Sequence, residues 1–461
     1  MNALKPVSPF RLCSLLRLQK DPNLALNLFQ NPNPDACSKK PFRYTILSYD
    51  LIISKLGRAK MFNEMEQILL QLKNDTRLAP NEIIFCNVIK FYGRARLPDH
   101  ALKVFDEMPS YRCQRTVKSV NSLLDALLNC RRFDKIREVF VGMEKYAFPD
   151  TCTYNVLIHA CCVNGCMDDA WVVFEEMRRK GLEPNGVTFA TLIKRFCVDL
   201  KIKEAFKLKE DMVRFFGLSP NVYAYSSLIK GLCGVGEVNI AFELKEEMVK
   251  NNIKVDSAIY STLISGLFKA GRKDEVSGVL EEIRINGCKL DTITYNVMIN
   301  GFCKLKDFEA AYRILEEMAD TGCKPDIISY NSIIGGLCKD GKWSHANDLF
   351  QDMPRRGCIP DVVSYRMLFD GICSGLEFNE AALILDEMIF KGYVPHSASI
   401  NRFVDGLCQE GNINLLSRVL KSLGKGNVID RDIWMMVISK ICKEEKLSIA
   451  PDLVDTLAGL N

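Results

Sequence analysis

The sequence predicts an all-α protein: an α-solenoid superhelix of about eleven 35-residue helix-turn-helix repeats, with degenerate caps at both ends. Three observations support this prediction. One pattern recurs at a spacing of 35 residues, as in "ITYNVMINGFCK" from Ile293 and "ISYNSIIGGLCK" from Ile328. Each copy contains two segments with helical periodicity, and turn residues separate these segments. Self-similarity with a period in this range is the signature of a helical-repeat array.

The array extends over residues 46–430, and the recurring pattern sets the first residue of each repeat. The repeats are 46–81, 82–116, 117–150, 151–185, 186–221, 222–256, 257–291, 292–326, 327–361, 362–396 and 397–430. The three repeats nearest the N-terminus match the pattern less well than the eight that follow. We expect residues 431–461 to form a partial repeat that caps the C-terminal end.

Each repeat is expected to contain two amphipathic helices, as the repeat from Thr151 illustrates. Its apolar residues recur at i, i+3, i+4 and i+7 in two segments. They are Tyr154, Leu157, Ile158 and Cys161, and then Ala170, Val173, Phe174 and Met177. Gly165 marks the turn between the helices, and Gly181 ends the second because glycine suits a left-handed C-cap. After Pro184, Asn185 can cap the next helix. A single hairpin cannot bury its apolar face, so neighbouring repeats must stack.

Residues 1–45 have two interpretations. The first twenty residues contain four basic side chains and no acidic one, which is typical of an organellar presequence. The segment "LQKDPNLALNLFQ" follows at once and has the pattern of a degenerate helical hairpin, so the basic residues also suit the first helix of the array. We expect a presequence, with the helical hairpin as the alternative, and the two can overlap.

Composition and charge are those of an ordinary folded protein. The hydrophobic fraction is 48%, the charged fraction 26% and the net charge +4. No apolar run is long enough to span a membrane, so no membrane partner is expected. The charge is milder than that of many nucleic-acid binders, although a local basic stripe is compatible with a nearly neutral total.

The 19 cysteines recur at repeat positions rather than in ligand-like pairs. Two series have the 35-residue spacing: Cys303, Cys338, Cys373 and Cys408, and Cys288, Cys323 and Cys358. Cysteines at one position of a repeat act as small apolar packing residues, which favours a reducing compartment. There is no C-x-x-C pair, so we expect no metal site of the usual zinc spacing.

A small polar residue recurs at the fifth position of the repeats, among apolar neighbours. These residues are Asn121, Asn155, Asn296, Asn331 and Asn401, with Ser226 and Ser261 in two other repeats. Asparagine inside a helix is less favourable than alanine by about 0.6 kcal/mol, so a purely structural repeat has no reason to select it. Helical-repeat proteins of this kind recognise one base per repeat with two or three side chains. We therefore interpret the fifth position as a base-recognition position.

Several motifs of the repeat from Thr292 resemble the pentatricopeptide repeat. The matching residues are Tyr295, Asn296, Gly301, Phe302, Cys303, Lys304, Ala311, Leu315, Glu316, Glu317, Met318 and Gly322 through Asp326. The tetratricopeptide repeat has a shorter period and a characteristic tryptophan that is absent here. The resemblance covers roughly residues 46–440. It implies the plain P-type subclass, which is found mainly in plant organelles.

The resemblance implies that the fifth and last residues of a repeat recognise one base together. Uridine is implied for Asn121 with Asp150, Asn296 with Asp326, Asn331 with Asp361, and Asn401 with Asp430. A pyrimidine is implied for Asn155 with Asn185, and guanosine for Ser226 with Asp256 and Ser261 with Asp291. The repeats from Ile46, Glu82, Gly186 and Val362 depart from the pattern. The expected site, from 5′ to 3′, is ??UY?GGUU?U. The alternative role of each last residue is a simple helix N-cap.

Two further positions are assigned by the resemblance and by charge. Residues at the second position are implied to stack on bases: Val187, Tyr223, Ile293, Ile328 and Val363, with Cys152 and Ala258 at the same place. The alternative is packing between repeats. Lysines at position thirteen are expected to face phosphates: Lys269, Lys304 and Lys339. A solvated surface is the alternative there.

No motif for catalysis occurs, so we expect no enzyme and no cofactor. None of the four histidines begins an H-x-E sequence, which a zinc deaminase requires. The sequence therefore predicts a monomeric, sequence-specific binder of single-stranded RNA in a mitochondrion, or alternatively a plastid. It would support RNA stabilisation, end processing, splicing or translation, with or without protein cofactors of RNA processing. The alternative function is a helical-repeat scaffold that binds protein partners.

Overall fold

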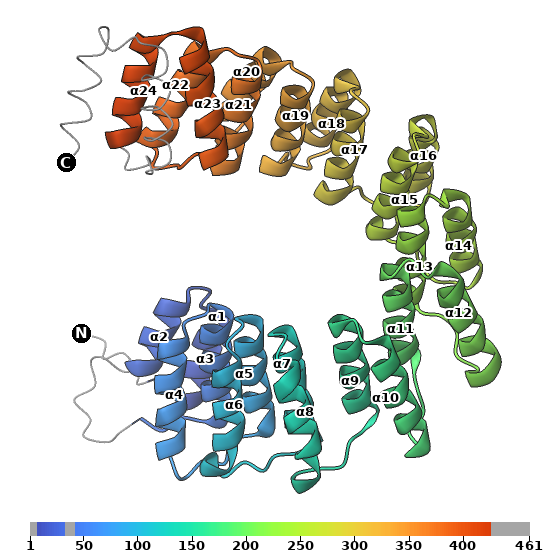
Figure 1. The fold of residues 1–461 in the computed structure, drawn as a ribbon. Helices are drawn as coiled ribbons and strands as arrows, with labels where there is room; N and C mark the ends of the chain where they lie inside the picture. Colours follow the sequence, from blue (N-terminus) through green and yellow to red (C-terminus); the bar gives the residue numbers. More distant parts are fainter. Residues whose placement is uncertain (1–6, 33–41, 426–461) are drawn as a thin grey trace. The chain divides into compact units, whose positions relative to one another are not determined.

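The computed structural model describes residues 7–32 and 42–425, and every regular element in these ranges is helical. The prediction of an all-α helical-repeat fold is confirmed (Figure 1). Two helices lie within residues 1–45: α1 (Pro9–Leu18) and α2 (Pro22–Gln30). They occupy the segment in which a helical hairpin was the alternative to a presequence. The expected partial repeat 431–461 lies outside the described residues.

The first helix of each repeat begins at the first residue of that repeat. These helices are α3 (Ile46–Arg58), α5 (Glu82–Arg94), α7 (Val117–Asn129), α9 (Thr151–Asn164), α11 (Gly186–Val198), α13 (Val222–Val235), α15 (Ser257–Lys269), α17 (Thr292–Lys304), α19 (Ile327–Lys339), α21 (Val362–Ser374) and α23 (Ser397–Glu410). Asp or Asn N-caps most of them, so the start of the helix is encoded locally.

The second helices complete the hairpins. They are α4 (Phe62–Asn74), α6 (Pro98–Glu107), α8 (Phe133–Val141), α10 (Met167–Arg179), α12 (Ile202–Phe216), α14 (Val238–Lys250), α16 (Val276–Ile285), α18 (Phe308–Asp320), α20 (Trp343–Asp352), α22 (Phe378–Phe390) and α24 (Ile413–Lys425). Short 3-10 helices are η1 (Met108–Tyr111), η2 (Met143–Lys145) and η3 (Lys273–Glu275). The glycines after several second helices have positive φ, for example 78° at Gly322, as a left-handed C-cap requires.

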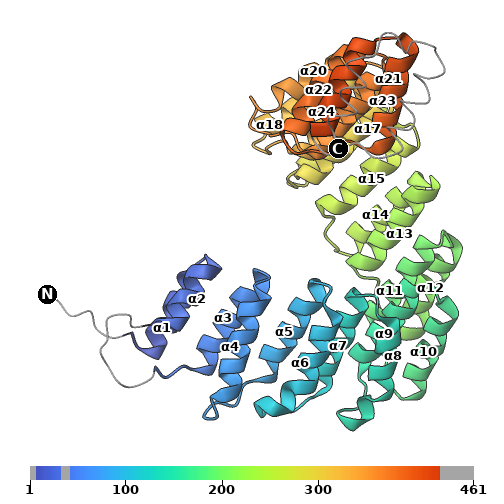
Figure 2. The same ribbon diagram turned by 60° about the vertical axis from the view of Figure 1, so that its left-hand side comes forward.

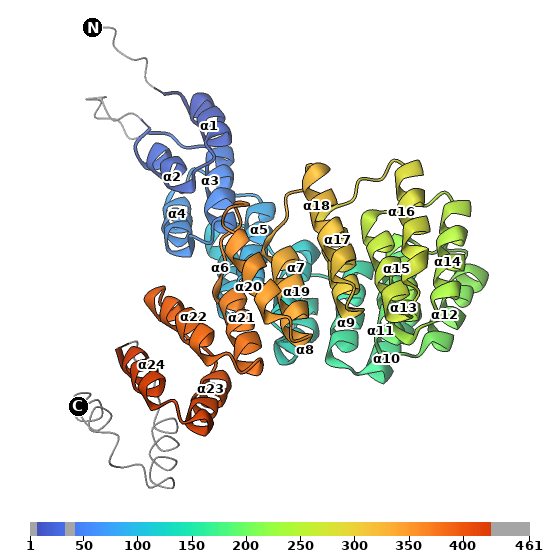
Figure 3. The same cartoon turned by 90° about the horizontal axis from the view of Figure 1, so that it is seen from above.

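The helices group into two units, residues 1–228 and 229–461, whose border lies within α13. In the first unit, α3, α5 and α7 form one layer and α4, α6 and α8 another (Figure 2). In the second unit, α15, α17, α19 and α21 follow one another in one layer (Figure 3). Within each unit, first helices of successive repeats therefore pack on one another, as in a solenoid.

A buried aromatic residue at the fourth position joins the two helices of a repeat. Tyr154, Tyr260 and Tyr365 are each at most 1% exposed. The hydroxyl of Tyr154 donates to Glu176 at 3.0 Å, and those of Tyr260 and Tyr365 donate to the corresponding glutamates of their own second helices. Because a buried hydroxyl needs a partner, this contact fixes the angle of the hairpin.

The G-x-C part of the motif is explained by close packing of successive first helices. A Cβ added to Gly266 would lie 2.6 Å from Cys233 Sγ, and one added to Gly336 would lie 2.9 Å from Cys303 Cβ. Only glycine fits at these crossings. Burial raises the pKa of the Cys303 thiol to about 12, so it stays protonated. The described cysteines are all free, and those at the twelfth position act as packing residues.

No described helix is long and apolar enough to cross a bilayer.

Candidate nucleic-acid interface

In three repeats, the fifth-position asparagine is hydrogen-bonded to the last residue of the same repeat. Nδ2 of Asn121 donates to Asp150 Oδ1 at 3.0 Å, and Nδ2 of Asn296 donates to Asp326 Oδ1 at 3.1 Å. Nδ2 of Asn155 donates to the side-chain oxygen of its partner Asn185 at 3.2 Å. These asparagines are half-buried. The fold therefore brings together residues that are 29 or 30 positions apart in the sequence.

The last residues are also helix N-caps, which is the alternative role expected of them. Asp326 Oδ1 accepts the backbone N–H groups of Ile328 and Ser329, each at 3.0 Å. Burial acts to raise the pKa of Asp326, but these bonds and the Asn296 amide lower it overall. The carboxylate is thus held ionised and accepts hydrogen bonds only. It faces the amino side of the asparagine amide.

A third group completes each of these sites, and sequence reasoning missed it. The hydroxyl at the third position of the following repeat donates to the asparagine carbonyl oxygen. Thr153 donates to Asn121 at 2.7 Å, and Ser329 donates to Asn296 at 2.6 Å. The corresponding Thr188 bond to Asn155 is 2.6 Å long. A recurring Ser or Thr at the third position was the available signal, but it also fits a capping box.

The repeat from Ile327 is different. Asp361 caps α21 through Val363 and Ser364. Burial acts to raise the pKa of Asp361, while bonds from Ser364, from Val363 and from the Asn331 amide lower it overall. Asn331 Oδ1 is buried and has no hydrogen-bond partner. Asn401 Oδ1 also has none among the described residues, and Asp430 lies outside them.

The two expected guanosine sites contain serines with other contacts. The Ser261 hydroxyl is 8% exposed and donates to Ala258 O at 3.0 Å within its own helix. Asp291 instead accepts from Ser257, at the first position, at 2.8 Å. In the other repeat, Ser226 lies half-buried on α13 and Asp256 caps α15. Ser257 was not identified from the sequence, because the first position carried no recurring signal.

Exposed apolar side chains recur at the second position of the repeats. Exposed fractions are 55% for Val187, 77% for Tyr223, 66% for Ile293, 58% for Ile328 and 47% for Val363. Leu47 and Ile83, at the same position of the first two repeats, are likewise exposed. Solvent exposure on this scale is inconsistent with packing between repeats. Their recurrence at one repeat position makes them candidate contacts for a ligand.

Basic side chains lie along the same helices. Lys269, Lys304 and Lys339 are exposed and form no ion pair with the described residues. Three further exposed lysines, which sequence reasoning missed, occupy the ninth position: Lys90, Lys194 and Lys230. The ninth position is one helical turn beyond the fifth and shares its face. Its signal was weak because other repeats carry Ser, Asn, Asp, His or Gly there.

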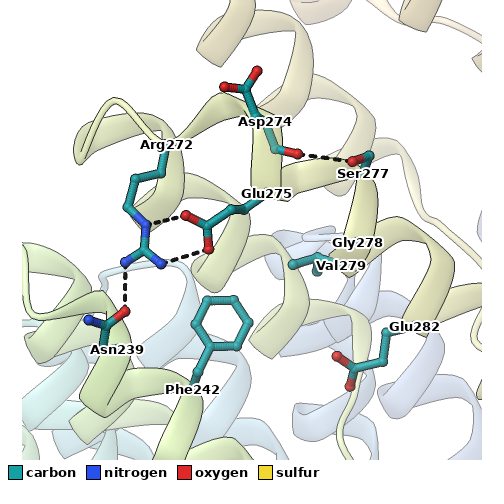
Figure 4. Close-up of a pocket in the computed structure, with 9 residues that line it drawn as sticks. All are labelled: Asn239, Phe242, Arg272, Asp274, Glu275, Ser277, Gly278, Val279 and Glu282. Atoms are coloured by element: carbon teal, nitrogen blue, oxygen red, sulfur yellow. Dashed lines mark hydrogen bonds and ion pairs between the residues drawn. The ribbon is translucent and has the colours of Figure 1, made fainter.

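A surface pocket lies away from these positions, on α14, η3 and α16 (Figure 4). Two of its charged residues are paired with each other: Arg272 donates to both oxygens of Glu275, and also to Asn239 Oδ1. No second, fifth or last residue of a repeat lines it. In the described ranges, no group of three or more His, Cys, Asp or Glu side chains could hold a metal ion.

Comparison with known proteins agrees with this repeat architecture. The PPR repeat family matches residues 149–198, 187–234, 220–269, 255–304, 290–338 and 325–374. The PPR repeat matches residues 83–113, and the pentatricopeptide repeat domain matches residues 103–164. Together these matches cover residues 83–374, more than half of the chain.

Two relatives come from Arabidopsis thaliana. A pentatricopeptide repeat-containing protein is 55% identical over 248 residues, 46% of this chain and 53% of the relative. Another, named as mitochondrial, is 30% identical over 203 residues, 43% of this chain and 48% of the relative. The chain thus spans about half the length of these relatives.

A solved structure shares the fold: the crystal structure of the pentatricopeptide repeat protein PPR10 from maize. The two superpose with a TM-score of 0.63 at 22% identity, over 98% of this chain and 69% of the maize chain. The family matches, the relatives and the fold all identify the same helical repeat. The chain belongs to the pentatricopeptide repeat family.

Proposed function

We propose that the chain binds single-stranded RNA sequence-specifically in an organelle, with one base recognised by each repeat. The observation that carries the proposal is the repeated site of three polar groups around Asn121, Asn155 and Asn296. In each, one amide N–H is bound to the last residue, and the second N–H is left for an external acceptor. The Watson–Crick edge of an unpaired base supplies such an acceptor.

Two other rows of side chains support the same ligand. The exposed apolar residues at the second position provide a stacking surface in most repeats, which suits unpaired bases. Lysines occur at the thirteenth position of some first helices and at the ninth position of others, and they can neutralise phosphates. A protein-binding scaffold requires no such repeated combination of amide, apolar surface and cation. The proposed role is therefore binding without catalysis, in support of RNA stabilisation, end processing, splicing or translation.

We further propose that the organelle is the mitochondrion. The basic, acid-free first twenty residues support it, as does the relative that is named as mitochondrial. A fluorescent fusion of the whole chain tests it: mitochondrial signal is expected, and a plastid signal would select the alternative. A cytosolic or nuclear signal would overturn organellar import.

Selection of bound RNAs from a random single-stranded pool tests the function. The expected result is enrichment of ??UY?GGUU?U, with little binding to the same sequence in a duplex, because a duplex hides the base edges. Equal affinity for single-stranded and duplex RNA, or enrichment of no sequence, would contradict the proposal. Absence of RNA binding would favour the protein-scaffold alternative.

A further inference from the structure

The third-position hydroxyls of three repeats contact the asparagine of the preceding repeat. These hydroxyls belong to Thr153, Thr188 and Ser329, and all three residues are 0% exposed. Each lies in a capping box, where it accepts the backbone N–H of the N-cap residue. A capping role alone would leave the hydroxyl proton free to bond any nearby acceptor. The distances from each hydroxyl oxygen indicate which acceptor is nearer.

Each hydroxyl has one proton and at least two oxygen acceptors within reach. Ser329 Oγ is 2.6 Å from Asn296 Oδ1 and 3.0 Å from Asp326 Oδ1. The distances for Thr153 are 2.7 Å to Asn121 and 2.9 Å to Asp150. Thr188 is 2.6 Å from Asn155 and 3.3 Å from Asn185. The asparagine carbonyl oxygen is the nearer acceptor in all three sites, which favours it for the proton.

We propose that these hydroxyls are positioning residues that fix the orientation of the asparagine amide and thereby sharpen the choice of base. This inference rests on the proposed function. The hydroxyl holds the carbonyl oxygen and the last residue holds one N–H, so rotation of the amide would break both bonds. A flipped amide would also direct its oxygen at an acceptor-only carboxylate. The fixed amide presents its remaining N–H to the RNA.

The repeat from Ile327 shows the same elements without this contact. Ser364 is also 0% exposed, lies in a capping box and donates to Asp361 Oδ1 at 3.0 Å. Asn331 Oδ1 nevertheless has no partner. Its carbonyl oxygen can accept from the amino group of cytosine or from N3–H of uracil. We therefore expect the nucleotide at Asn331 to be recognised less strictly than the nucleotide at Asn296.

This difference supplies a matched pair of variants. Ser329→Ala and Ser364→Ala each remove a buried capping hydroxyl, but only the first removes a bond to an asparagine. Purified proteins are titrated with RNAs in which U is replaced by C at one nucleotide, facing either Asn296 or Asn331. Ser329→Ala is expected to reduce the U-over-C preference at the Asn296 nucleotide about three- to tenfold, the range for one neutral hydrogen bond. Ser364→Ala is expected to leave the preference at the Asn331 nucleotide unchanged.

Two further variants keep the test decisive. Ser329→Thr retains the hydroxyl and is expected to keep the U-over-C preference at the Asn296 nucleotide. Threonine is compatible with the third position, since Thr153 occupies it in another repeat. Thr153→Val keeps the buried volume and removes the hydroxyl, so it tests the Asn121 site even if Ser329→Ala fails to fold. An unchanged preference in Ser329→Ala and in Thr153→Val would overturn the positioning role alone. A wild-type protein without preference at the Asn296 nucleotide would overturn the proposed function and this inference together.

Discussion

Replacing Asn296 by Ser is the sharpest test of base recognition by one repeat. The resemblance assigns Asn with Asp to uridine and Ser with Asp to guanosine, so the preference at this nucleotide should move from U toward G. Affinity for the original RNA should fall by about 1–3 kcal/mol, the range for one mismatched contact in DNA recognition. The other nucleotides should keep their preferences, because each contacts a different repeat.

The structure also gives the expected change in stability. The variant loses two bonds: the one from Asn296 to Asp326 and the one from Ser329 to Asn296. Ser329 keeps an acceptor, because its hydroxyl already lies 3.0 Å from Asp326. The repeat from Ser257 shows this arrangement, since Thr294 donates to Asp291 at 2.7 Å where the fifth residue is Ser261. The net loss is about one hydrogen bond, or about 1 kcal/mol.

The assay uses two RNAs that differ only at this nucleotide, each titrated against the wild-type protein and the variant. Thermal unfolding of both proteins measures the stability change separately. A crossover in preference, with the variant favouring the G-containing RNA, is the expected result. Equal weakening of both RNAs, or unfolding of the variant, would show that Asn296 is structural and that the one-repeat, one-base assignment fails there.

Three other predictions concern packing, charge and pH. Gly266→Ala should destabilise the protein by about 1–3 kcal/mol through a clash with Cys233; Gly278→Ala, where nothing lies within 4 Å, should not, and thermal unfolding of both variants compares them. Joint replacement of Lys269, Lys304 and Lys339 by alanine should reduce the slope of log affinity against log salt concentration by about 2, at about 0.7 per phosphate contact. Base preference should not change, and RNA titrations at several salt concentrations measure both. The pKa of Asp326 is lowered on folding, so its stabilising contribution is present above the unfolded pKa and is lost as pH falls through the folded value. The stability difference between wild type and Asp326→Asn, measured by denaturant unfolding, should therefore shrink in acid; a difference that stays constant would contradict the role of the ionised carboxylate.

The sequence was sufficient for features that depend on local interactions. These features are the period of 35 residues, the two amphipathic segments of each repeat and the capping residues. Each depends on residues within one repeat or in adjacent segments. For that reason the all-α repeat fold was correctly predicted, and the first helices begin at the residues where the repeats were taken to begin. The recurrence of Asn at the fifth position likewise indicated candidate site residues before any contact was known.

Only the tertiary structure decided which polar groups meet. The bond from Ser329 to Asn296 joins residues 33 positions apart, and in the sequence that serine has the pattern of a capping residue alone. The same packing selects Ser257 rather than Ser261 as the partner of Asp291. It also leaves Asn331 Oδ1 without a partner, although its repeat has the same Asn, Asp and Ser as its neighbour. Helix periodicity fixes the face on which a side chain lies. Whether a hydrogen bond forms depends on differences of a few tenths of an ångström in the donor–acceptor distance, and the packing of successive first helices sets that distance.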